Sequence, residues 1–297
     1  MRQKMEIEWI EQLRSRAGSE LLGDDAAVLG DTIITVDMLT EGIDFLLGRV
    51  DPKWIGRKAL AVNLSDIAAM GGIPTFIVIA VALPKSAGIQ LAEQLYNGME
   101  PLIQKYSLTL AGGDTNTWNN GLVISVTILG RVTPHGVLRR NGGKSGDRIL
   151  VTGLLGGSIL EHQFLFEPRI FEALYLNEHF NIHAAIDISD GFSLDLHRLS
   201  VESGLGAVLH ENSIPISPAA VQLSQQTGKT PLEHALSDGE DFELLLAVPP
   251  DEAEKLLHLQ PLREQFNVTL YSVAELTSEP GLRFSNGTAL QPQGFEH

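Results

Sequence analysis

Aspartates that stand beside glycine or at expected strand ends recur along this chain and raise the question of its chemistry. Asp25, Asp37, Asp114, Asp187 and Asp190 all occupy such places. Carboxylates at element ends can converge on hard cations such as Mg²⁺, which prefer oxygen ligands. Each pair taken singly is also ordinary turn chemistry, in which aspartate caps a helix or accepts from backbone N–H groups. A metal site is therefore indicated only where several of these carboxylates meet.

Asp66 stands in a stretch that is apolar nearly all round. Residues 59–70 read Ala-Leu-Ala-Val-Asn-Leu-Ser-Asp-Ile-Ala-Ala-Met, which is typical of a buried helix. Asn63 and Asp66 are three residues apart and so share a helix face. A buried, unpaired carboxylate is costly or takes up a proton, so Asp66 needs either a cation or a set of hydrogen-bond donors.

Two further acidic segments precede or follow expected strands. Residues 187–191 read Asp-Ile-Ser-Asp-Gly, which predicts a strand that runs into a loop, with Gly191 opening a helix whose free N–H groups can face an anion. Residues 239–243 read Gly-Glu-Asp-Phe-Glu before another strand. Alone, this second segment indicates a solvated acidic turn.

Several common kinds of site are excluded by missing motifs. The chain has no G-x-G-x-x-G, no G-x-x-x-x-G-K-[ST], no H-E-x-x-H and no G-x-S-x-G. It has no cysteine, so thiolate nucleophiles and sulfur-bound zinc are excluded, and its nine histidines are scattered. Any metal must therefore sit mainly on oxygen ligands, and a bound nucleotide must be held through cations and glycine turns.

Charge and hydropathy limit the partners. The formal net charge is −16, which repels a phosphate backbone, so no nucleic-acid partner is expected. The longest apolar run, residues 76–83, is too short to span a membrane, and acidic residues near the start replace the apolar run of a secretory signal. No membrane association is expected. Together with the absence of cysteine, this predicts a cytoplasmic protein.

The elements that must position these residues alternate between strands and helices, which predicts a mixed α/β (α+β) fold. Residues 133–147 concentrate glycine, arginine and lysine without apolar periodicity, so we expect two domains, 1–138 and 139–297. The first is expected to hold strands at 26–29, 32–36, 75–83, 108–111 and 122–132 and helices at 52–70 and 86–106. The second is expected to hold strands at 148–152, 184–188, 207–209, 242–248 and 268–273 and helices at 168–180, 192–203 and 250–257.

Taken together, the segments resemble one enzyme family, the thiamine-monophosphate kinases. The resemblance rests on residues 23–29, 35–39, 58–71, 112–115, 187–191 and 239–244, with Arg140 before Gly146-Asp147, in order and spacing over nearly the whole chain. That family belongs to the aminoimidazole ribonucleotide synthetase superfamily, whose members are homodimers with N-terminal sheets paired across the two-fold. The resemblance implies that domain 1–138 binds ATP and Mg²⁺ and dimerises, and that domain 139–297 closes the active-site cleft.

The resemblance also implies an activity and its residues. The activity is transfer of a phosphoryl group from ATP to thiamine monophosphate, in line and without a covalent intermediate, with several Mg²⁺ ions neutralising the two anions. Implied metal ligands are Asp25, Thr35, Asp37, Asp66, Asp114, Asp187 and Asp190, of which Asp66, Asp114 and Asp190 are the implied catalytic residues. Implied ATP contacts are Gly113, Asp114, Arg140 and Ser189. Implied acceptor contacts are Asp44, Glu240 and Phe295.

Three departures from the family pattern lie on the acceptor side. Asp44 stands where the family usually has histidine, the segment between residues 153 and 168 is shorter than usual, and the tail Gly-Phe-Glu-His replaces a more aromatic ending. Two alternatives therefore stay open: an ATP-dependent enzyme of the same fold with another small acceptor, and a non-catalytic regulatory dimer that binds ATP and Mg²⁺. Superfamily members that rely on cysteine are disfavoured, because this chain has none.

Overall fold

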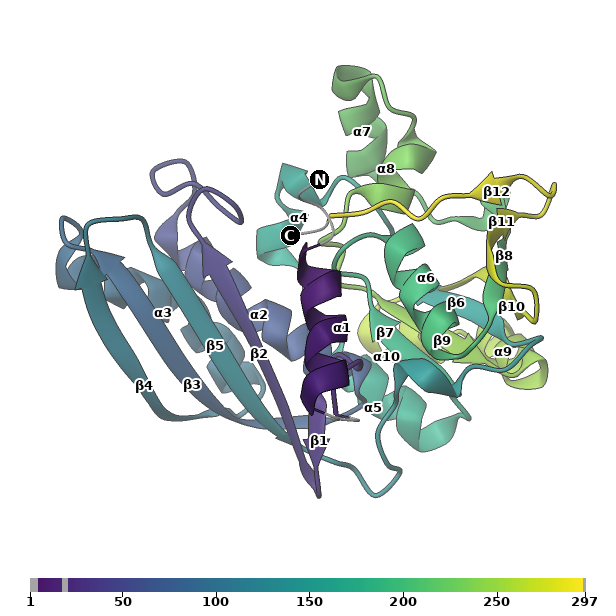
Figure 1. Cartoon of the computed structure of the whole chain (residues 1–297), viewed down its shortest axis with the longest axis horizontal. Helices are drawn as coiled ribbons and strands as arrows, with labels where there is room; N and C mark the ends of the chain where they lie inside the picture. Colours follow the sequence, from purple (N-terminus) through teal and green to yellow (C-terminus); the bar gives the residue numbers. More distant parts are fainter. Residues whose placement is uncertain (1–4, 18–20, 296–297) are drawn as a thin grey trace.

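A computed structural model describes residues 5–17 and 21–295 of the chain. Two β-sheets, each with helices packed on it, lie side by side (Figure 1). The expectations that concern residues 1–4 and the last two residues of the tail fall outside the described part. Within the described residues, no helix is both long enough and apolar enough to cross a membrane.

The first sheet has the strand order β1-β2-β5-β3-β4. β3 and β4 run parallel and are joined by a helix, whereas the other neighbours are antiparallel. This sheet is the βαβ-containing layer that the sequence predicts. Its strands are β1 (Ala27–Leu29), β2 (Thr32–Thr40), β3 (Ile73–Pro84), β4 (Thr109–Trp118) and β5 (Val123–Arg131).

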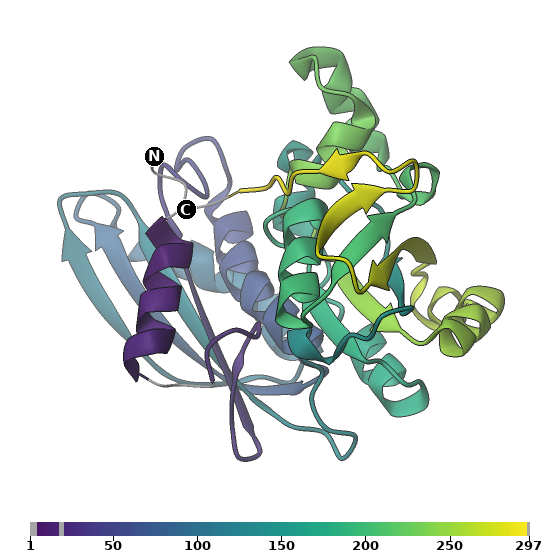
Figure 2. The same ribbon diagram turned by 45° about the vertical axis from the view of Figure 1, so that its right-hand side comes forward.

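Helix α2 (Pro52–Ala69) is the central element of the molecule. Asp51 caps it by accepting from the backbone N–H of Lys53 at 2.9 Å, and Gly71, with φ of 60°, follows its end. α2 packs against β2 and β5 on one side and against α5 (Ile170–His179) and β7 (Ala184–Asp187) of the second unit on the other (Figure 2). Burial on both sides explains why its sequence is apolar nearly all round.

Helix α3 (Gly88–Lys105) crosses α2 closely at two glycines. A Cβ added to Gly98 would lie 1.8 Å from the carbonyl oxygen of Lys53, and one added to Gly56 would lie 1.9 Å from that of Leu95. Both obstacles are backbone atoms, so the helices would have to move apart to admit a side chain. The glycines therefore set the distance between α2 and α3.

Replacing Gly98 by alanine is expected to lower the free energy of unfolding by about 1–3 kcal/mol, because overpacking outweighs the gain in helix propensity. Urea denaturation measures the change. The matched control is Asn97→Ala at the neighbouring exposed position, which should leave stability equal or slightly higher. Equal stability of Gly98→Ala and the parent would contradict the close crossing.

The second sheet has the order β12-β11-β8-β10-β6-β9-β7 and lies between two helical layers. On one face, Ile149 and Val151 pack with α6 (Phe192–Glu202) and α8 (Pro231–Ser237). On the other, Leu150 joins the core shared with α2, α9 (Pro250–Leu259) and α10 (Pro261–Phe266). Its strands are β6 (Arg148–Thr152), β7 (Ala184–Asp187), β8 (Gly206–Leu209), β9 (Leu244–Val248), β10 (Leu270–Thr277), β11 (Gly281–Phe284) and β12 (Ala289–Leu290). The remaining helices are α1 (Met5–Ala17), α4 (His162–Leu165), α5 (Ile170–His179), α6 (Phe192–Glu202), α7 (Pro218–Thr227), α8 (Pro231–Ser237), α9 (Pro250–Leu259) and α10 (Pro261–Phe266).

The predicted mixed α/β fold with two sheets is confirmed, but the predicted ends of two strands are wrong. β2 continues to Thr40, so Asp37 lies inside a strand and not at its end. β4 runs from Thr109 to Trp118, so Gly113 and Asp114 lie inside a strand instead of after it. Pairing with β3 overrides the weak strand propensity of Gly-Gly-Asp, and a Cβ at Gly113 would meet the carbonyl oxygen of Ile79 at 2.1 Å.

Candidate active site

Three carboxylates from three separate elements meet between the two sheets. Asp25 precedes β1, Asp66 lies on α2 and Asp187 ends β7. Each offers one carboxylate oxygen, and these oxygens all lie within 4.8 Å of one another. We call this group the carboxylate cluster. Three carboxylate oxygens placed this close together could hold a metal ion.

Burial and mutual repulsion disfavour the charged forms of the carboxylates in this cluster. Burial and the neighbouring charges of Asp37 and Asp187 raise the pKa of Asp66 well above its ordinary value, and burial together with Asp25 does the same to the pKa of Asp187. The hydroxyl of Thr35 donates to Asp66, and that of Ser65 donates to Asp187 at 2.6 Å, which offsets only part of this.

Among the described residues, Asp25 Oδ2 is buried without a hydrogen-bond partner. An orphaned carboxylate oxygen beside two carboxyl groups with raised pKa values fits a divalent cation, which would supply the missing positive charge.

Asp37 lies beside the carboxylate cluster on β2. Its backbone N–H donates to Asn63 Oδ1 at 3.0 Å, while Asn63 Nδ2 donates to the carbonyl of Ala59 at 3.1 Å. Burial, followed by the charge of Asp190, raises the pKa of Asp37 to about 6. Asn63 is thus a fully buried residue that positions Asp37. The two polar residues of the apolar helix therefore differ in role: Asn63 holds the backbone of Asp37, and Asp66 belongs to the carboxylate cluster.

Two arginines neutralise carboxylates around the cluster. Arg140 pairs with Asp25 at 2.5 Å, and the side chain of Asp25 is only 1% exposed. Arg198 pairs with Asp190 and, at 2.8 Å, with Asp195. Burial and the charge of Asp190 raise the pKa of Asp195 to about 7, so this aspartate belongs to the same acidic network.

The loop after β7 gathers the acceptor-side candidates. The carbonyl of Ser189 accepts from the backbone N–H of Glu240 at 2.6 Å, and that of Asp190 accepts from the N–H of Phe295 at 2.8 Å. Glu240 has a left-handed backbone, with φ of 54°, and so does Phe242, with φ of 50°. Such non-glycine conformations cost about 1–3 kcal/mol each and concentrate at functional sites.

Asp44 has a structural partner that the sequence did not reveal. Its Oδ2 accepts from the backbone N–H of Thr40 at 2.6 Å and closes the turn after β2. Its charge still reaches the site, because it contributes to the raised pKa of Asp37. The anion at this position therefore belongs to the loop and not to the carboxylate cluster.

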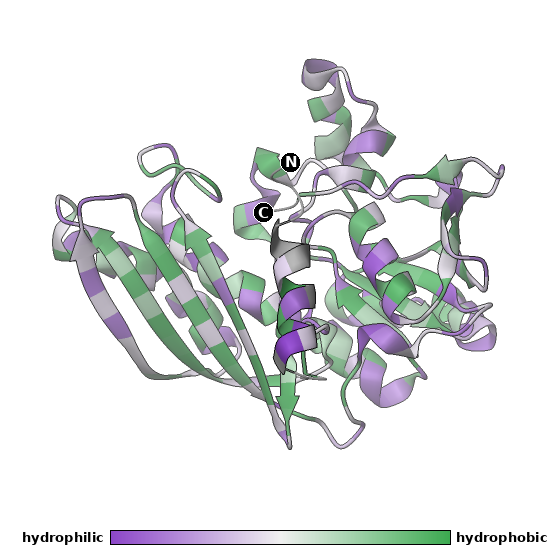
Figure 3. Ribbon diagram, in the orientation of Figure 1, coloured by the Kyte–Doolittle hydropathy of each residue, from purple (hydrophilic) through white to green (hydrophobic). Residues whose placement is uncertain are grey.

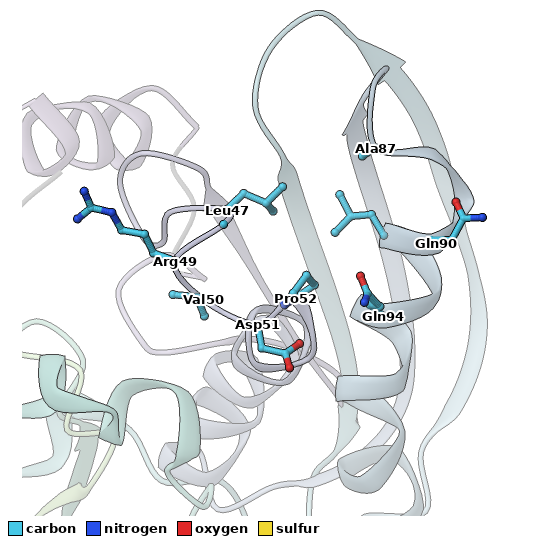
Figure 4. A pocket seen from close by; sticks show the side chains of 10 residues that line it. Leu47, Arg49, Val50, Asp51, Pro52, Ala87, Gln90 and Gln94 are labelled. Carbon is cyan, nitrogen blue, oxygen red and sulfur yellow. The ribbon is translucent and has the colours of Figure 1, made fainter.

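A cavity of about 630 Å³ lies behind the same loop, between residues 47–52 and the first turns of α3 (Figure 4). Leu47 extends toward α3, while Arg49 points to the other side of the loop. Gln90 and Gln94 line its far wall. None of the three members of the carboxylate cluster lines this cavity, so it is separate from the acidic site.

Gly113 and Asp114 are not brought to the carboxylate cluster within one chain. They lie on β4, at the opposite edge of the first sheet from β1, and every residue of β4 is exposed. Three strand spacings separate β4 from β2, which is about 14 Å. The other implied ligands, including Asp37 and Asp190, gather around the cluster.

Sequence reasoning missed three charged residues of the site: Lys58, Asp195 and Arg198. Lys58 interrupts the same apolar helix as Asp66 and is fully buried, so the argument that singled out Asp66 applies to it equally. Asp195 and Arg198 lie on α6 at i and i+3, which looks like an ordinary surface ion pair in the sequence. Only the folded chain places them against Asp190.

Comparisons with known proteins identify the family of this chain. Residues 23–132 match the N-terminal domain of AIR synthase related proteins, and residues 144–285 match the C-terminal domain. The chain is similar to thiamine-monophosphate kinase of Rhodopirellula baltica, with 40% identity covering 93% of this chain and 90% of the relative. The corresponding protein of Synechococcus elongatus shares 32% identity over 96% of this chain and 94% of its own length.

A solved structure described as "AaThiL complexed with AMPPCP and TMP" has a TM-score of 0.85 and 26% identity, covering all of this chain and 98% of that one. Thiamine monophosphate kinase from Aquifex aeolicus gives a TM-score of 0.81 at 27% identity, over 98% of this chain and 100% of that one. Sequence and fold agree over the full length, and the chain belongs to the thiamine-monophosphate kinase family of AIR synthase related proteins.

Proposed function

We propose that this chain transfers the γ-phosphoryl group of ATP to thiamine monophosphate and so forms thiamine diphosphate. The observation that carries the proposal is the carboxylate cluster, whose buried oxygens are suited to cations, in a chain whose relatives bear the name of this kinase. Transfer between two phosphates needs little covalent chemistry from the protein. It needs charge neutralisation and alignment, which such a cluster supports.

Asp25, Asp66 and Asp187 would hold Mg²⁺, with Asp37, Asp190 and the hydroxyl of Thr35 beside them. Bound Mg²⁺ supplies the positive charge that lets two anionic phosphates approach each other. Arg140 and Ser189 would contact ATP, and Glu240 and Phe295 would contact the acceptor. Asp66 and Asp190 act by fixing where the charge is neutralised, so a loss of either carboxylate should be felt in the transfer step.

We extend the proposal to a homodimer in which Gly113 and Asp114 reach the partner's site. Val36 and Met38 on β2 and Phe76 on β3 are 59%, 62% and 45% exposed, and hydrophobic residues run along these strands (Figure 3). Exposed apolar faces of this kind indicate an interface. β4 adds an exposed sheet edge. If a second copy covers this face, Asp114 of one protomer would approach the carboxylate cluster of the other protomer.

The same proposal assigns ATP binding, Mg²⁺ binding and dimerisation to domain 1–138, and closure of the cleft to domain 139–297. Arg140, just past that boundary, supports the cleft assignment because it pairs with Asp25 of the first domain. The proposal includes a cytoplasmic location, with which the absence of cysteine is compatible. Cell fractionation with an antibody to the native chain tests it.

The proposed function is tested with purified protein, ATP, Mg²⁺ and a panel of phosphorylated acceptors that includes thiamine monophosphate. ADP release and product mass are measured together. We expect ADP release that requires thiamine monophosphate and a product of the mass of thiamine diphosphate. Turnover with another acceptor alone would favour the different-acceptor alternative, and ATP binding without turnover would favour the regulatory dimer.

Replacing Asp44 by asparagine is expected to lower KM for thiamine monophosphate by about two- to tenfold. The amide oxygen can still accept from Thr40, while a negative charge near the substrate phosphate is removed. Steady-state kinetics with each substrate measure the effect, and KM for ATP serves as the internal reference. A higher KM for thiamine monophosphate would show instead that Asp44 attracts a cationic part of the acceptor, such as the thiazolium ring.

A further inference from the structure

Lys58 is a lysine with a fully buried side chain, on the α2 face that meets the acceptor side of the site. Its ammonium pairs with Glu240 Oε1, donates to Gln163 Oε1 at 2.9 Å and lies 3.4 Å from the carbonyl oxygen of Asp44. The Nζ atom is also 5.1 Å from the centre of the Phe164 ring. A lysine ammonium has three N–H donors, and three acceptors surround this one.

The three acceptors come from three separate segments. Asp44 lies in the loop after β2, Gln163 lies on α4, and Glu240 lies in the loop before β9. The ammonium of Lys58 thus ties together the Asp44 loop, helix α4 and the loop that carries Glu240.

Burial makes this junction rigid. A charged lysine withdrawn from water is stable only while its acceptors stay in place, so each of the three segments is held by the others. The carboxylate of Glu240 is 31% exposed, which means that it borders solvent while one of its oxygens is fixed from behind. With Oε1 fixed by Lys58, the partly exposed carboxylate of Glu240 is held in one orientation.

We infer that Lys58 is a positioning residue for the acceptor: it orients Glu240 and the Asp44 loop and thereby sets the affinity for the acceptor without touching ATP. The inference rests on the proposed function and adds a determinant of substrate selection to it. The acceptor chemistry that Glu240 suits is a cationic or N–H-bearing heterocycle, as in thiamine monophosphate. Holding Glu240 in place limits the loss of side-chain entropy when such a ring binds.

Replacing Lys58 by methionine tests the inference. Methionine keeps the unbranched shape and the contact with Phe164, while Glu240 can be hydrated because it borders solvent. We expect KM for thiamine monophosphate to rise by about tenfold or more, because a charged hydrogen-bond network is lost. KM for ATP should stay within about twofold. Calorimetry should show the same rise in the Kd of thiamine monophosphate.

Lys105→Met is the matched control. Lys105 also pairs with a glutamate, Glu167, at 2.5 Å and lies 5.3 Å from the ring centre of Tyr106, but it is at the far end of α3 and 42% exposed. Both KM values should stay at the parental level in this variant. If KM for thiamine monophosphate rose in both lysine variants, the cause would be a general effect of removing a lysine that pairs with glutamate and contacts a ring.

A double-mutant cycle separates positioning from a merely structural role. If Lys58 acts through Glu240, Lys58→Met combined with Glu240→Gln should raise KM for thiamine monophosphate no further than the more harmful single variant, within about twofold. Additive effects of the two changes, or equal changes in both KM values, would overturn the inference. Should Lys58→Met not fold, Gln163→Met removes one acceptor and should raise the same KM by about threefold.

The outcomes distinguish this inference from the proposed function. A parent protein that neither binds nor phosphorylates thiamine monophosphate overturns the proposed function and this inference with it. A parent that does both, with unchanged KM and Kd in Lys58→Met, overturns only the role of Lys58.

Discussion

Asp66→Asn is expected to reduce phosphoryl transfer by at least about 10²-fold while leaving the fold intact. Asparagine has nearly the same shape and can still accept from the Thr35 hydroxyl, so the packing of α2 is kept. What is lost is one negative charge among three carboxylates whose oxygens lie within 4.8 Å. Asp190→Asn, at the other wall of the site, should have an effect of the same kind.

Stability gives a second and independent measure of the same variant. The pKa of Asp66 is raised in the folded state, so the parent loses stability as the pH rises above the unfolded value of 3.8 toward the folded value. Without Mg²⁺ at pH 7.5, Asp66→Asn should therefore melt a few degrees above the parent. At pH 4 the two should melt together, and added Mg²⁺ should stabilise the parent more than the variant.

The control is Asp31→Asn, which removes an exposed aspartate in the turn between β1 and β2. It should change neither turnover nor the response to Mg²⁺. Near-parental turnover in Asp66→Asn, or equal stability of the metal-free proteins at pH 7.5, would contradict the role of the carboxylate cluster. Turnover is measured in the presence of Mg²⁺ and substrates, whereas melting is also measured without Mg²⁺. Agreement between the two measurements is therefore a strict test.

The part of the site carried by α2 could be predicted because its signal is local. A helix that is apolar all round must be buried, and a carboxylate within it must find a partner, so Asp66 was recognisable from residues 59–70 alone. Lys58 carried the same signal in the same helix and could have been found by the same argument. Its partners could not, since Gln163 and Glu240 are more than a hundred residues away.

The ends of β2 and β4 were not predictable, because tertiary pairing and not local propensity decides them. Gly-Gly-Asp-Thr is a poor strand former, yet β3 provides a parallel partner for residues 109–118. The pairing of the Asp44 carboxylate with the backbone of Thr40 was equally hidden, because a sequence shows a charge but not which donor it meets. Long-range pairing thus decided whether Asp114 lies in a strand, whereas Asp44 found its donor only four residues away.

The edge position of Asp114 leads to the second large effect. Within one chain β4 is about 14 Å from β2, so Asp114 can serve the carboxylate cluster only if it comes from a second copy. In a two-fold dimer each site would then combine Asp66 of one protomer with Asp114 of its partner. Asp114→Asn alone should be nearly as inactive as Asp66→Asn, although the two residues lie far apart in the chain.

Co-expressing Asp66→Asn and Asp114→Asn under two different affinity tags and isolating the mixed dimer decides the point. If each site draws on both chains, one site of the mixed dimer carries both changes and the other carries neither, so activity should return to about half that of the parent dimer. If each chain supplies its own Asp114, every site is damaged and the mixed dimer stays as inactive as either variant.

A doubly tagged Asp66→Asn dimer controls for the tags and must remain inactive. Recovery of about half the parental activity would establish that the protein is a dimer and that Asp114 acts in the site of the partner protomer. No recovery would restrict the site to residues of a single chain, namely Asp25, Asp37, Asp66, Asp187 and Asp190.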